Sequence, residues 1–478
     1  MAWKMIDGYE MVIGLEVHVE LKTKTKIFCS CPTTFGAAPN TQCCPVCMGF
    51  PGTLPVLNQQ VVHYAVLAGL ATSCTIAHYS KQDRKNYFYP DLPKAYQISQ
   101  YDLPLCIGGH LMIETEEGEK RIGITRIHIE EDAGKLVHDP EKGTLIDCNR
   151  CGVPLIEIVS EPDIRTPQEA VSYLRKLKAV IEYTGVSDCR MQEGSLRCDV
   201  NLSVHKQDEP FGTRTEMKNL NSFTSVQRAI EEEYRRQVEA VKAGEKIMQE
   251  TRRFDQNTGK TSSMRRKENA NDYRYFPDPD LAPIVLTDAQ IEAWRRELPQ
   301  LPDARKAVYM KQYGLTAYAA EQLVSSKYLA DYFEAAAQST DAVKMVANLM
   351  ITEVFRLLDG EDGTIPLSPA SLAKIANMTE SQVISVGTAR KTITALWSQP
   401  EDPENYVTRM GLKQLSDETL LMTYVRQAID KHPEMVAGYR KGKLTLKNAL
   451  MGAAMGLSGG KANPVVLQKL MDQALDEE

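Results

Sequence analysis

A chain of 478 residues is too long for a single hydrophobic core, so we expect about two to four domains. The hydrophobic content of 43% and the charged content of 25% are those of an ordinary soluble globular protein. The net charge of -7 excludes nucleic-acid binding through overall charge, so any such contact requires a local basic surface.

The amino terminus carries Lys4, Asp7 and Glu10, which interrupt any apolar stretch of signal-peptide length. No apolar run in the sequence reaches transmembrane length. We therefore expect a cytoplasmic protein without membrane contact. The eleven cysteines are odd in number and all lie between Cys29 and Cys198, which does not fit the disulfide framework of a secreted protein.

Residues 14–21 (GLEVHVEL) alternate apolar and polar side chains, which predicts a β-strand with two distinct faces. Glu16, His18 and Glu20 share the polar face and offer oxygen and nitrogen ligands to a metal ion. The alternative is a strand face that is merely solvated, as in most one-sided sheets.

Four cysteines form two close pairs early in the chain: Cys29 with Cys31, and Cys44 with Cys47. This spacing is typical of a structural zinc site, because four thiolates fill a tetrahedral shell and leave no open position for chemistry. The alternative is a set of unpaired buried cysteines. Cys148 and Cys151 form a further CxxC pair, for which we favour simple burial over a redox role.

Residues 83–100 mix cations with aromatic rings, including Lys85, Tyr87 and Tyr89. Aromatic faces stack on bases and cations bind phosphates, so this segment is a candidate site for ATP or for a single-stranded RNA end. A solvated loop braced by prolines is an equally good interpretation of this composition.

Two later strands carry carboxylates in unusual places. Residues 124–135 place His128 and Glu130 on one face and bring Glu131 to the strand end, and a regular strand cannot point Glu130 and Glu131 at one ligand. In residues 154–163, Glu157 lies among apolar side chains, where a lone carboxylate requires a metal, a cation or a proton. Several carboxylates with one histidine favour magnesium and phosphoryl transfer or a similar nucleotide-dependent step.

A helix is predicted after Thr166, with Pro167 at its first position, Glu169 closing a capping box and Gly185 ending it. A second helix begins near Ser222. Two strands are expected at residues 195–204 and 213–218. Their polar faces suit a sheet that lines a substrate site slightly better than a solvated face; these faces include Arg197, Asp199, Asn201, Glu216 and Lys218.

The carboxyl-terminal part of the chain changes to alanine-rich helical segments without cysteine. We predict an α+β fold with a large sheet-containing domain over residues 1–292, a helical domain over 293–403 and a small helical tail domain over 404–478. A linker is expected at residues 398–404. Basic residues gather in the tail, as in a tRNA-contacting surface or a soluble helical surface; they are Arg440, Lys441, Lys443, Lys447 and Lys461.

The sequence closely resembles the B subunits of bacterial tRNA-dependent amidotransferases. The resemblance rests on GLEVHVEL, HIEEDAGK, PLIEIVSEPD, EGSLRCDVN, DYRYFPDPD and GKANP, and it spans nearly the whole chain. It implies a ligase that uses ATP to activate the side-chain carboxyl of misacylated Glu-tRNA(Gln) or Asp-tRNA(Asn) and then amidates it. It also implies a heterotrimer in which a glutaminase A subunit supplies ammonia and a small C subunit holds the pair together. The sequence contains no amidase-like Gly/Ser-rich run, in agreement with ammonia production by a partner.

The resemblance further implies roles for individual residues. Glu16, His18, Glu131 and Glu157 would hold Mg²⁺, with Glu130 close by as a further catalytic residue. The ATP phosphates or the aminoacyl end would be positioned by Lys85, Tyr87, Tyr89, Arg197, Asp199 and Asn201. Glu216 and Lys218 would line the ammonia route, and zinc would support the fold without taking part in the reaction.

Two alternatives from other functional classes remain open. One is a tRNA-binding scaffold subunit without catalysis, in which Glu157 would be dispensable for amidation. The other is an ATP-dependent amide ligase that acts on a small molecule and turns over without charged tRNA.

Overall fold

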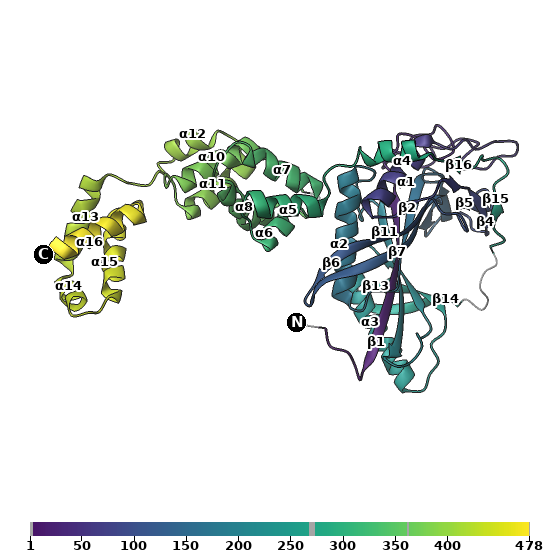
Figure 1. Cartoon of the computed structure of the whole chain (residues 1–478), viewed down its shortest axis with the longest axis horizontal. Helices are drawn as coiled ribbons and strands as arrows, with labels where there is room; N and C mark the ends of the chain where they lie inside the picture. The colour runs from purple at the N-terminus through teal and green to yellow at the C-terminus, as the bar shows by residue number, and fades with distance from the viewer. Residues whose placement is uncertain (1–2, 267–272, 361–362, 478) are drawn as a thin grey trace. The chain divides into compact units, whose positions relative to one another are not determined.

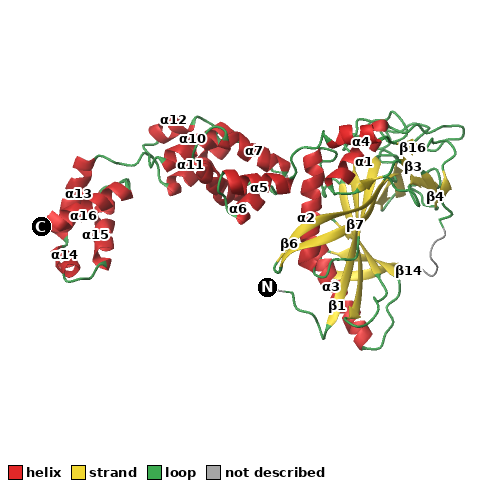
Figure 2. Cartoon of the chain, viewed as in Figure 1, coloured by secondary structure: helices red, strands yellow, loops and turns green. Residues whose placement is uncertain are grey.

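The computed structural model describes residues 3–266, 273–360 and 363–477. The chain divides into two compact units. The first contains residues 1–305 with 325–327, and the second contains residues 306–324 and 328–478. The first unit mixes strands and helices and the second is helical, as Figure 2 shows, so the predicted α+β class is confirmed.

The first unit is built on a nine-stranded sheet with the order β14-β13-β12-β11-β1-β10-β7-β6-β2. Its strands are β1 (Tyr9–Glu20), β2 (Thr75–Ile76), β6 (Cys106–Thr115), β7 (Gly118–Glu131), β10 (Pro154–Ser160), β11 (Leu196–Lys206), β12 (Thr215–Leu220), β13 (Glu250–Asp255) and β14 (Lys260–Arg266). The β12–β13 pair is parallel and the other neighbouring pairs are antiparallel. The central strand β1 contains the predicted alternating run.

Three helices pack against this sheet: α1 (Gln59–Ala71), α2 (Pro167–Thr184) and α3 (Phe223–Lys242) (Figure 1). The apolar residues Leu15, Val17 and Val19 of β1 are almost completely buried in the core between sheet and helices. Because side chains alternate along a strand, the polar residues of β1 point to the opposite face of the sheet. Burial of the apolar face therefore determines which way Glu16, His18 and Glu20 point.

The helix signals in the sequence are confirmed except for one contact. The Thr166 hydroxyl accepts a hydrogen bond from the Glu169 backbone N–H, and Gly185 ends α2 with a φ of 74°. The Glu169 carboxylate does not close a capping box, because it accepts from the backbone N–H of Arg165, one residue before the cap. The Ser222 hydroxyl caps α3 by accepting from the Ser225 N–H.

Smaller elements complete the first unit. They are β15 (Phe276–Pro277), β4 (Asp83–Asn86) and β5 (Tyr96–Ser99) in one sheet, β16 (Ile284–Val285) with β3 (Tyr79–Ser80), the hairpin of β8 (Lys135–Asp139) and β9 (Gly143–Asp147), and helix α4 (Asp288–Arg295). Strand β5 lies against β7, so the aromatic segment 83–100 reaches the end of the strand that carries His128 and Glu130.

The helices after residue 300 form two separate hydrophobic cores, one from Tyr309 to Val407 and one from Leu421 to Leu475. The helices are α5 (Pro302–Gln312), α6 (Ala317–Leu323), α7 (Lys327–Ala337), α8 (Val343–Leu349), the π-helical turn η1 (Met350–Val354), α9 (Phe355–Leu357), α10 (Pro369–Glu380), α11 (Val386–Ser398), α12 (Pro403–Arg409), α13 (Glu418–Lys431), α14 (Pro433–Arg440), α15 (Thr445–Leu457) and α16 (Pro464–Glu477). Because α12 contributes Val407 to the first of these cores, that core continues past the predicted linker at 398–404. No described helix is long and apolar enough to cross a bilayer.

Candidate functional site

The polar face of the central strands brings together residues that lie far apart in the sequence. His18 on β1 pairs with Glu157 on β10, and Glu157 in turn pairs with His128 on β7. On the other side of β1, His18 pairs with Arg197 on β11. Four adjacent strands thus present one polar row across the middle of the sheet, on the face opposite α1, α2 and α3.

The carboxylates of this row meet at His18. Its Nε2 atom lies 3.4 Å from a carboxylate oxygen of Glu130 and 3.4 Å from one of Glu157. The Nε2 atom of His128 lies 3.6 Å and 3.5 Å from the same two carboxylates. Ligand atoms of His18, Glu130 and Glu157 all lie within 4.8 Å of one another, close enough to bind one metal ion.

The electrostatics of this cluster, which we call the His18 cluster (His18, His128, Glu130 and Glu157), favour a cation. Burial alone would raise the pKa of Glu130, but hydrogen bonds with His128 and His18 hold it well below its usual range. Burial opposes protonation of His18, yet its contacts with Glu130 and Glu157 raise its pKa to about 10. The carboxylates thus remain charged beside the imidazoles, and two carboxylates with an imidazole are ligands that fit a hard divalent cation, which also binds phosphate oxygens.

Glu131 lies elsewhere. It follows Glu130 in a regular strand and therefore points to the other face, where its carboxylate forms an ion pair with Lys94 and accepts a hydrogen bond of 2.9 Å from the Ile98 N–H. It is not in the group of ligand atoms around His18. Of the two neighbouring glutamates, it is therefore Glu130 whose carboxylate lies beside His18, whereas the ligand set implied by the resemblance contains Glu131.

Glu16 also lies outside the His18 cluster and belongs to a second group, which we call the Lys218 cluster (Glu16, Asp199, Glu216 and Lys218). The three carboxylates have ligand atoms within 4.8 Å of one another. Lys218 forms ion pairs with Asp199 and Glu216, the latter at 3.0 Å, and Asn201 donates a hydrogen bond of 2.9 Å to Glu16. Burial and the neighbouring carboxylates raise the pKa of Glu16, with burial the larger cause.

Three members of the His18 cluster, His18, Glu130 and Glu157, line a cleft with a volume of about 880 Å³. Lys85 enters this cleft with its ammonium 5.0 Å from the ring centre of Tyr273 and 5.8 Å from that of Tyr87. Burial would lower the pKa of Lys85, but the nearby Glu130 carboxylate and other groups raise it. The predicted residue Tyr89 is not among the residues that line this cleft, and it is 53% exposed.

Two further cations that line the cleft share one carboxylate. Arg197 donates a hydrogen bond of 2.6 Å to Asp132, and the Nε atom of Arg150 lies 3.4 Å from the same oxygen. Burial is the largest cause that raises the pKa of Glu20 to about 8, followed by its proximity to Asp132. The cleft is thus lined by cationic side chains and by carboxylates.

Some residues of this site were not identified from the sequence. His128 shares a face with Glu130 in the predicted strand, but its contact with Glu157 depends on the pairing of β10 with β7. Arg150 and Asp132 reach the cleft from strand ends and turns, where alternation gives no information about direction. Tyr273 lies nearly 190 residues from Lys85 in sequence, within the run DYRYFPDPD, and was not identified as a site residue.

The four predicted zinc ligands converge. Sulfur atoms of Cys29, Cys31, Cys44 and Cys47 all lie within 4.8 Å of one another, and the neighbouring Cys43 is outside this group. A hydrogen bond with Cys29, together with the Cys44 N–H, lowers the pKa of Cys47 to about 4. Four sulfur ligands at this spacing fit a tetrahedral metal site.

The basic residues of the tail lie on or between its last helices. Arg440, Lys441, Lys443 and Lys461 are exposed, whereas Lys447 is partly buried and forms an ion pair with Asp472. Lys447 is therefore less available to a polyanion than the exposed lysines.

Comparison with known proteins places nearly the whole chain in one family. Residues 11–292 match the family described as the GatB/GatE catalytic domain, and residues 331–475 match the GatB domain. The B subunit of the aspartyl/glutamyl-tRNA(Asn/Gln) amidotransferase of Caldicellulosiruptor bescii is 54% identical over 477 residues, covering 98% of this chain and 99% of that protein. The proteins of the same description from Caldanaerobacter subterraneus subsp. tengcongensis and Carboxydothermus hydrogenoformans are each 52% identical, over 98% of this chain and 100% and 99% of their own lengths. The expected resemblance is thereby confirmed, and the chain belongs to the B-subunit family of the aspartyl/glutamyl-tRNA amidotransferases.

Proposed function

We propose that this protein uses ATP to activate the side-chain carboxyl of Glu-tRNA(Gln) or Asp-tRNA(Asn) and converts it to the amide, giving Gln-tRNA(Gln) or Asn-tRNA(Asn). One observation carries this proposal: His18, Glu130 and Glu157 line a cleft of about 880 Å³ that also contains Lys85 and Arg197. Carboxylates for a divalent cation and basic side chains for phosphates are the usual components of phosphoryl-transfer sites.

The chemistry explains why ATP is needed. A carboxylate does not react with ammonia, because its carbonyl carbon is a poor electrophile and oxide is a poor leaving group. Attack of the carboxylate oxygen on the γ-phosphorus of ATP forms an acyl phosphate and releases ADP. Ammonia then attacks the acyl carbon, the bond to the phosphate oxygen breaks, and phosphate leaves with the amide formed.

Individual residues have distinct tasks in this scheme. His18, Glu130 and Glu157 would hold Mg²⁺, which when bound neutralises charge on the transferring phosphoryl group. Lys85 and Arg197, which both line the cleft, would bind phosphate oxygens, and the Tyr87 ring beside Lys85 would shield its ammonium from water. The Lys218 cluster lies on the neighbouring row of the sheet and offers polar groups to ammonia on its way to the acyl carbon.

The remaining parts of the chain support this reaction. We propose that ammonia comes from a glutaminase A subunit and that a small C subunit completes a heterotrimer in the cytoplasm. The four-cysteine site would bind structural Zn²⁺. A middle helical domain would connect the catalytic domain to the tail domain at residues 404–478, whose exposed basic residues, Arg440, Lys441, Lys443 and Lys461, would contact the tRNA.

One assay tests the proposal against both alternatives. The purified complex is given ATP and ammonium with Glu-tRNA, with Asp-tRNA, or with free glutamate or aspartate, and ADP and amidated product are measured. We expect ADP and amide only with a charged tRNA, and the two tRNAs separately identify the substrate. Turnover with the free amino acids would instead indicate a small-molecule ligase, and amidation that does not require Glu157 would indicate a scaffold.

A further inference from the structure

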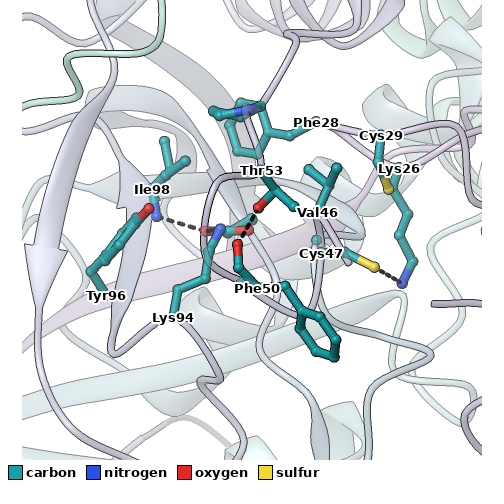
Figure 3. Close-up of a pocket in the computed structure, with 14 residues that line it drawn as sticks. Lys26, Phe28, Cys29, Val46, Cys47, Phe50, Thr53, Lys94, Tyr96 and Ile98 are labelled. Atoms are coloured by element: carbon teal, nitrogen blue, oxygen red, sulfur yellow. Dashed lines mark hydrogen bonds and ion pairs between the residues drawn. The ribbon is translucent and has the colours of Figure 1, made fainter. Parts of the chain in front are cut away.

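Lys26 occupies an unusual position beside the four-cysteine site. Its side chain is completely buried, with a relative exposure of 0%. Its ammonium lies 3.5 Å from the Cys47 sulfur and 3.2 Å from the backbone oxygen of Cys148. Figure 3 shows the side chain reaching Cys47 at one end of a small pocket.

Within the described part of the chain, no carboxylate oxygen forms an ion pair with Lys26 within 4.0 Å. Lys94 lines the same pocket and differs in this respect, because its ammonium is paired with Glu131. A buried ammonium is strongly unfavourable unless an anion lies beside it, and a carbonyl oxygen with a neutral thiol supplies no negative charge. Of the two groups that the Lys26 ammonium contacts, the Cys47 sulfur is the one that can carry negative charge.

A zinc ion bound by four thiolates provides this anion, since two positive charges meet four negative ones and leave the site with two surplus negative charges. The surplus charge is itself unfavourable in a buried site and is stabilised by donors to sulfur. Cys47 has two such donors: the Lys26 ammonium and the Cys44 backbone N–H, which lies 3.2 Å away. The buried ammonium thus neutralises part of the negative charge of the tetrathiolate site, and the site in turn stabilises the ammonium.

We propose that Lys26 is a positioning residue of the metal site, which neutralises part of the tetrathiolate charge and orients the Cys47 sulfur. The same ammonium binds the Cys148 carbonyl, and the Ile27 N–H donates a hydrogen bond of 2.9 Å to the Gly152 oxygen. Lys26 therefore also attaches the cysteine loop to the turn that precedes β10, the strand carrying Glu157. The inference depends on the proposed metal loading but not on the proposed reaction.

The test uses the full-length chain together with its partner subunits, with Co²⁺ in place of Zn²⁺, because sulfur-to-cobalt charge-transfer bands report on the thiolates directly. In Lys26→Met we expect these bands to move to lower energy and metal affinity to fall by about 10-fold or more, the range seen when outer-shell partners are removed. Lys26→Arg retains a cation and should recover most of both losses. Lys24→Met is the matched control, since Lys24 is exposed two residues earlier in the same segment and should leave both readouts unchanged.

The outcomes separate this inference from the proposed metal loading. If the unaltered protein binds neither cobalt nor zinc, the loading itself is wrong and the inference fails with it. If it binds cobalt and the bands of Lys26→Met do not move, Lys26 has no role at the sulfur. Should Lys26→Met not fold, Lys26→Gln decides, because its amide can still donate to the Cys148 oxygen but carries no charge, so its bands should also move to lower energy.

Discussion

Two carboxylate clusters occupy adjacent rows on one face of the same sheet, and they differ in how their charge is balanced. In the Lys218 cluster the chain supplies a lysine, which is paired with Asp199 and Glu216. In the His18 cluster the partners of Glu130 and Glu157 are two imidazoles, which carry charge only when protonated. We infer that the cluster paired with a lysine is less suited to a metal ion, whereas the imidazoles of the His18 cluster can give up their protons and act as metal ligands.

The surroundings of the two clusters agree with this difference. The carboxylates Glu130 and Glu157 line the cleft that contains Lys85, so an ion bound there would also meet phosphate oxygens. Asp199 and Lys218 line the same cleft, whereas Glu16 and Glu216 do not, so it is the lysine and not the cleft that separates the two clusters. The residue types are nearly the same, and the position of one lysine distinguishes a candidate metal site from a polar lining.

The strongest test of this comparison is Glu157→Gln. The amide has nearly the same shape but no charge, so the His18 cluster loses part of its affinity for a divalent cation. A bound cation contributes several kcal/mol to phosphoryl transfer, so we expect ADP formation with charged tRNA to fall on the order of 10³-fold. The rate is measured in single-turnover reactions at saturating ATP.

Binding of the charged tRNA, measured by filter retention, should be unchanged in Glu157→Gln because the exposed basic residues of the tail are intact. Wild-type rates of ADP formation in this variant would show that the cluster is not a phosphoryl-transfer site.

A second test compares two neighbouring residues. Glu130→Gln should reduce activity about 100-fold and raise the magnesium concentration needed for half-maximal rate, because Glu130 contacts His18. Glu131→Gln should leave that magnesium dependence unchanged and instead lower the free energy of unfolding by about 3 kcal/mol, because it breaks the buried pair with Lys94. Urea unfolding and a magnesium titration of each variant distinguish these effects, and a magnesium response in Glu131→Gln alone would reverse our assignment.

This pair of residues also shows what the sequence determined and what it did not. Alternation in residues 14–21 correctly predicted the shared face of Glu16, His18 and Glu20, because burying the apolar residues fixes the orientation of every side chain in a strand. The same rule predicted that Glu130 and Glu131 diverge. It did not predict which of them meets His18, because that depends on how β10 and β7 pair across the sheet.

Local sequence patterns likewise did not predict the contacts between segments that are distant in the sequence. Glu16 shares the polar face with His18, but the pairing of β1 with β11 brings it to Asp199 and so to Lys218. The cysteine pairs are the opposite case, since their short spacing and tight turns made their convergence predictable. Local spacing therefore predicted one site well, whereas the long-range sheet register decided the other.

A third test removes the permanent cation of the Lys218 cluster. Lys218→Met leaves three carboxylates without their lysine, so the lining rearranges and ammonia reaches the acyl carbon less efficiently. We expect amide formation to fall about 10-fold relative to ADP formation, as small misplacements of reacting groups commonly do. The ratio of amide to ADP is measured with ammonium as donor. Lys206→Met, an exposed change at the end of the neighbouring strand β11, is the control, and an unchanged ratio in Lys218→Met would remove this cluster from the ammonia route.

The smallest expected effect, a change in stability, comes from a buried carboxylate whose charge is neutralised by arginines of the chain. Glu233 on α3 is fully buried, and it forms ion pairs with Arg236 at 2.6 Å and with Arg252 at 3.2 Å. Burial alone would raise the pKa of Glu233, but hydrogen bonds with Arg236, Gln237 and Thr215 lower it. Because Glu233 is paired with internal cations, as the carboxylates of the Lys218 cluster are, we expect it to stabilise the fold and not to bind a metal ion.

The folded state therefore binds the Glu233 proton less tightly than the unfolded chain does. Its stabilisation is fully present above the unfolded pKa of about 4.3 and is lost as the pH falls through the lower folded pKa. Glu233→Gln should reduce stability at pH 7 and make the further loss of stability between about pH 5 and pH 3 smaller by about 1 kcal/mol. Urea unfolding at a series of pH values measures this, and the magnesium dependence of the reaction should stay at its wild-type value. An altered magnesium dependence would mean that pairing with a lysine or arginine of the chain is not a valid criterion for separating structural carboxylates from metal ligands in this protein.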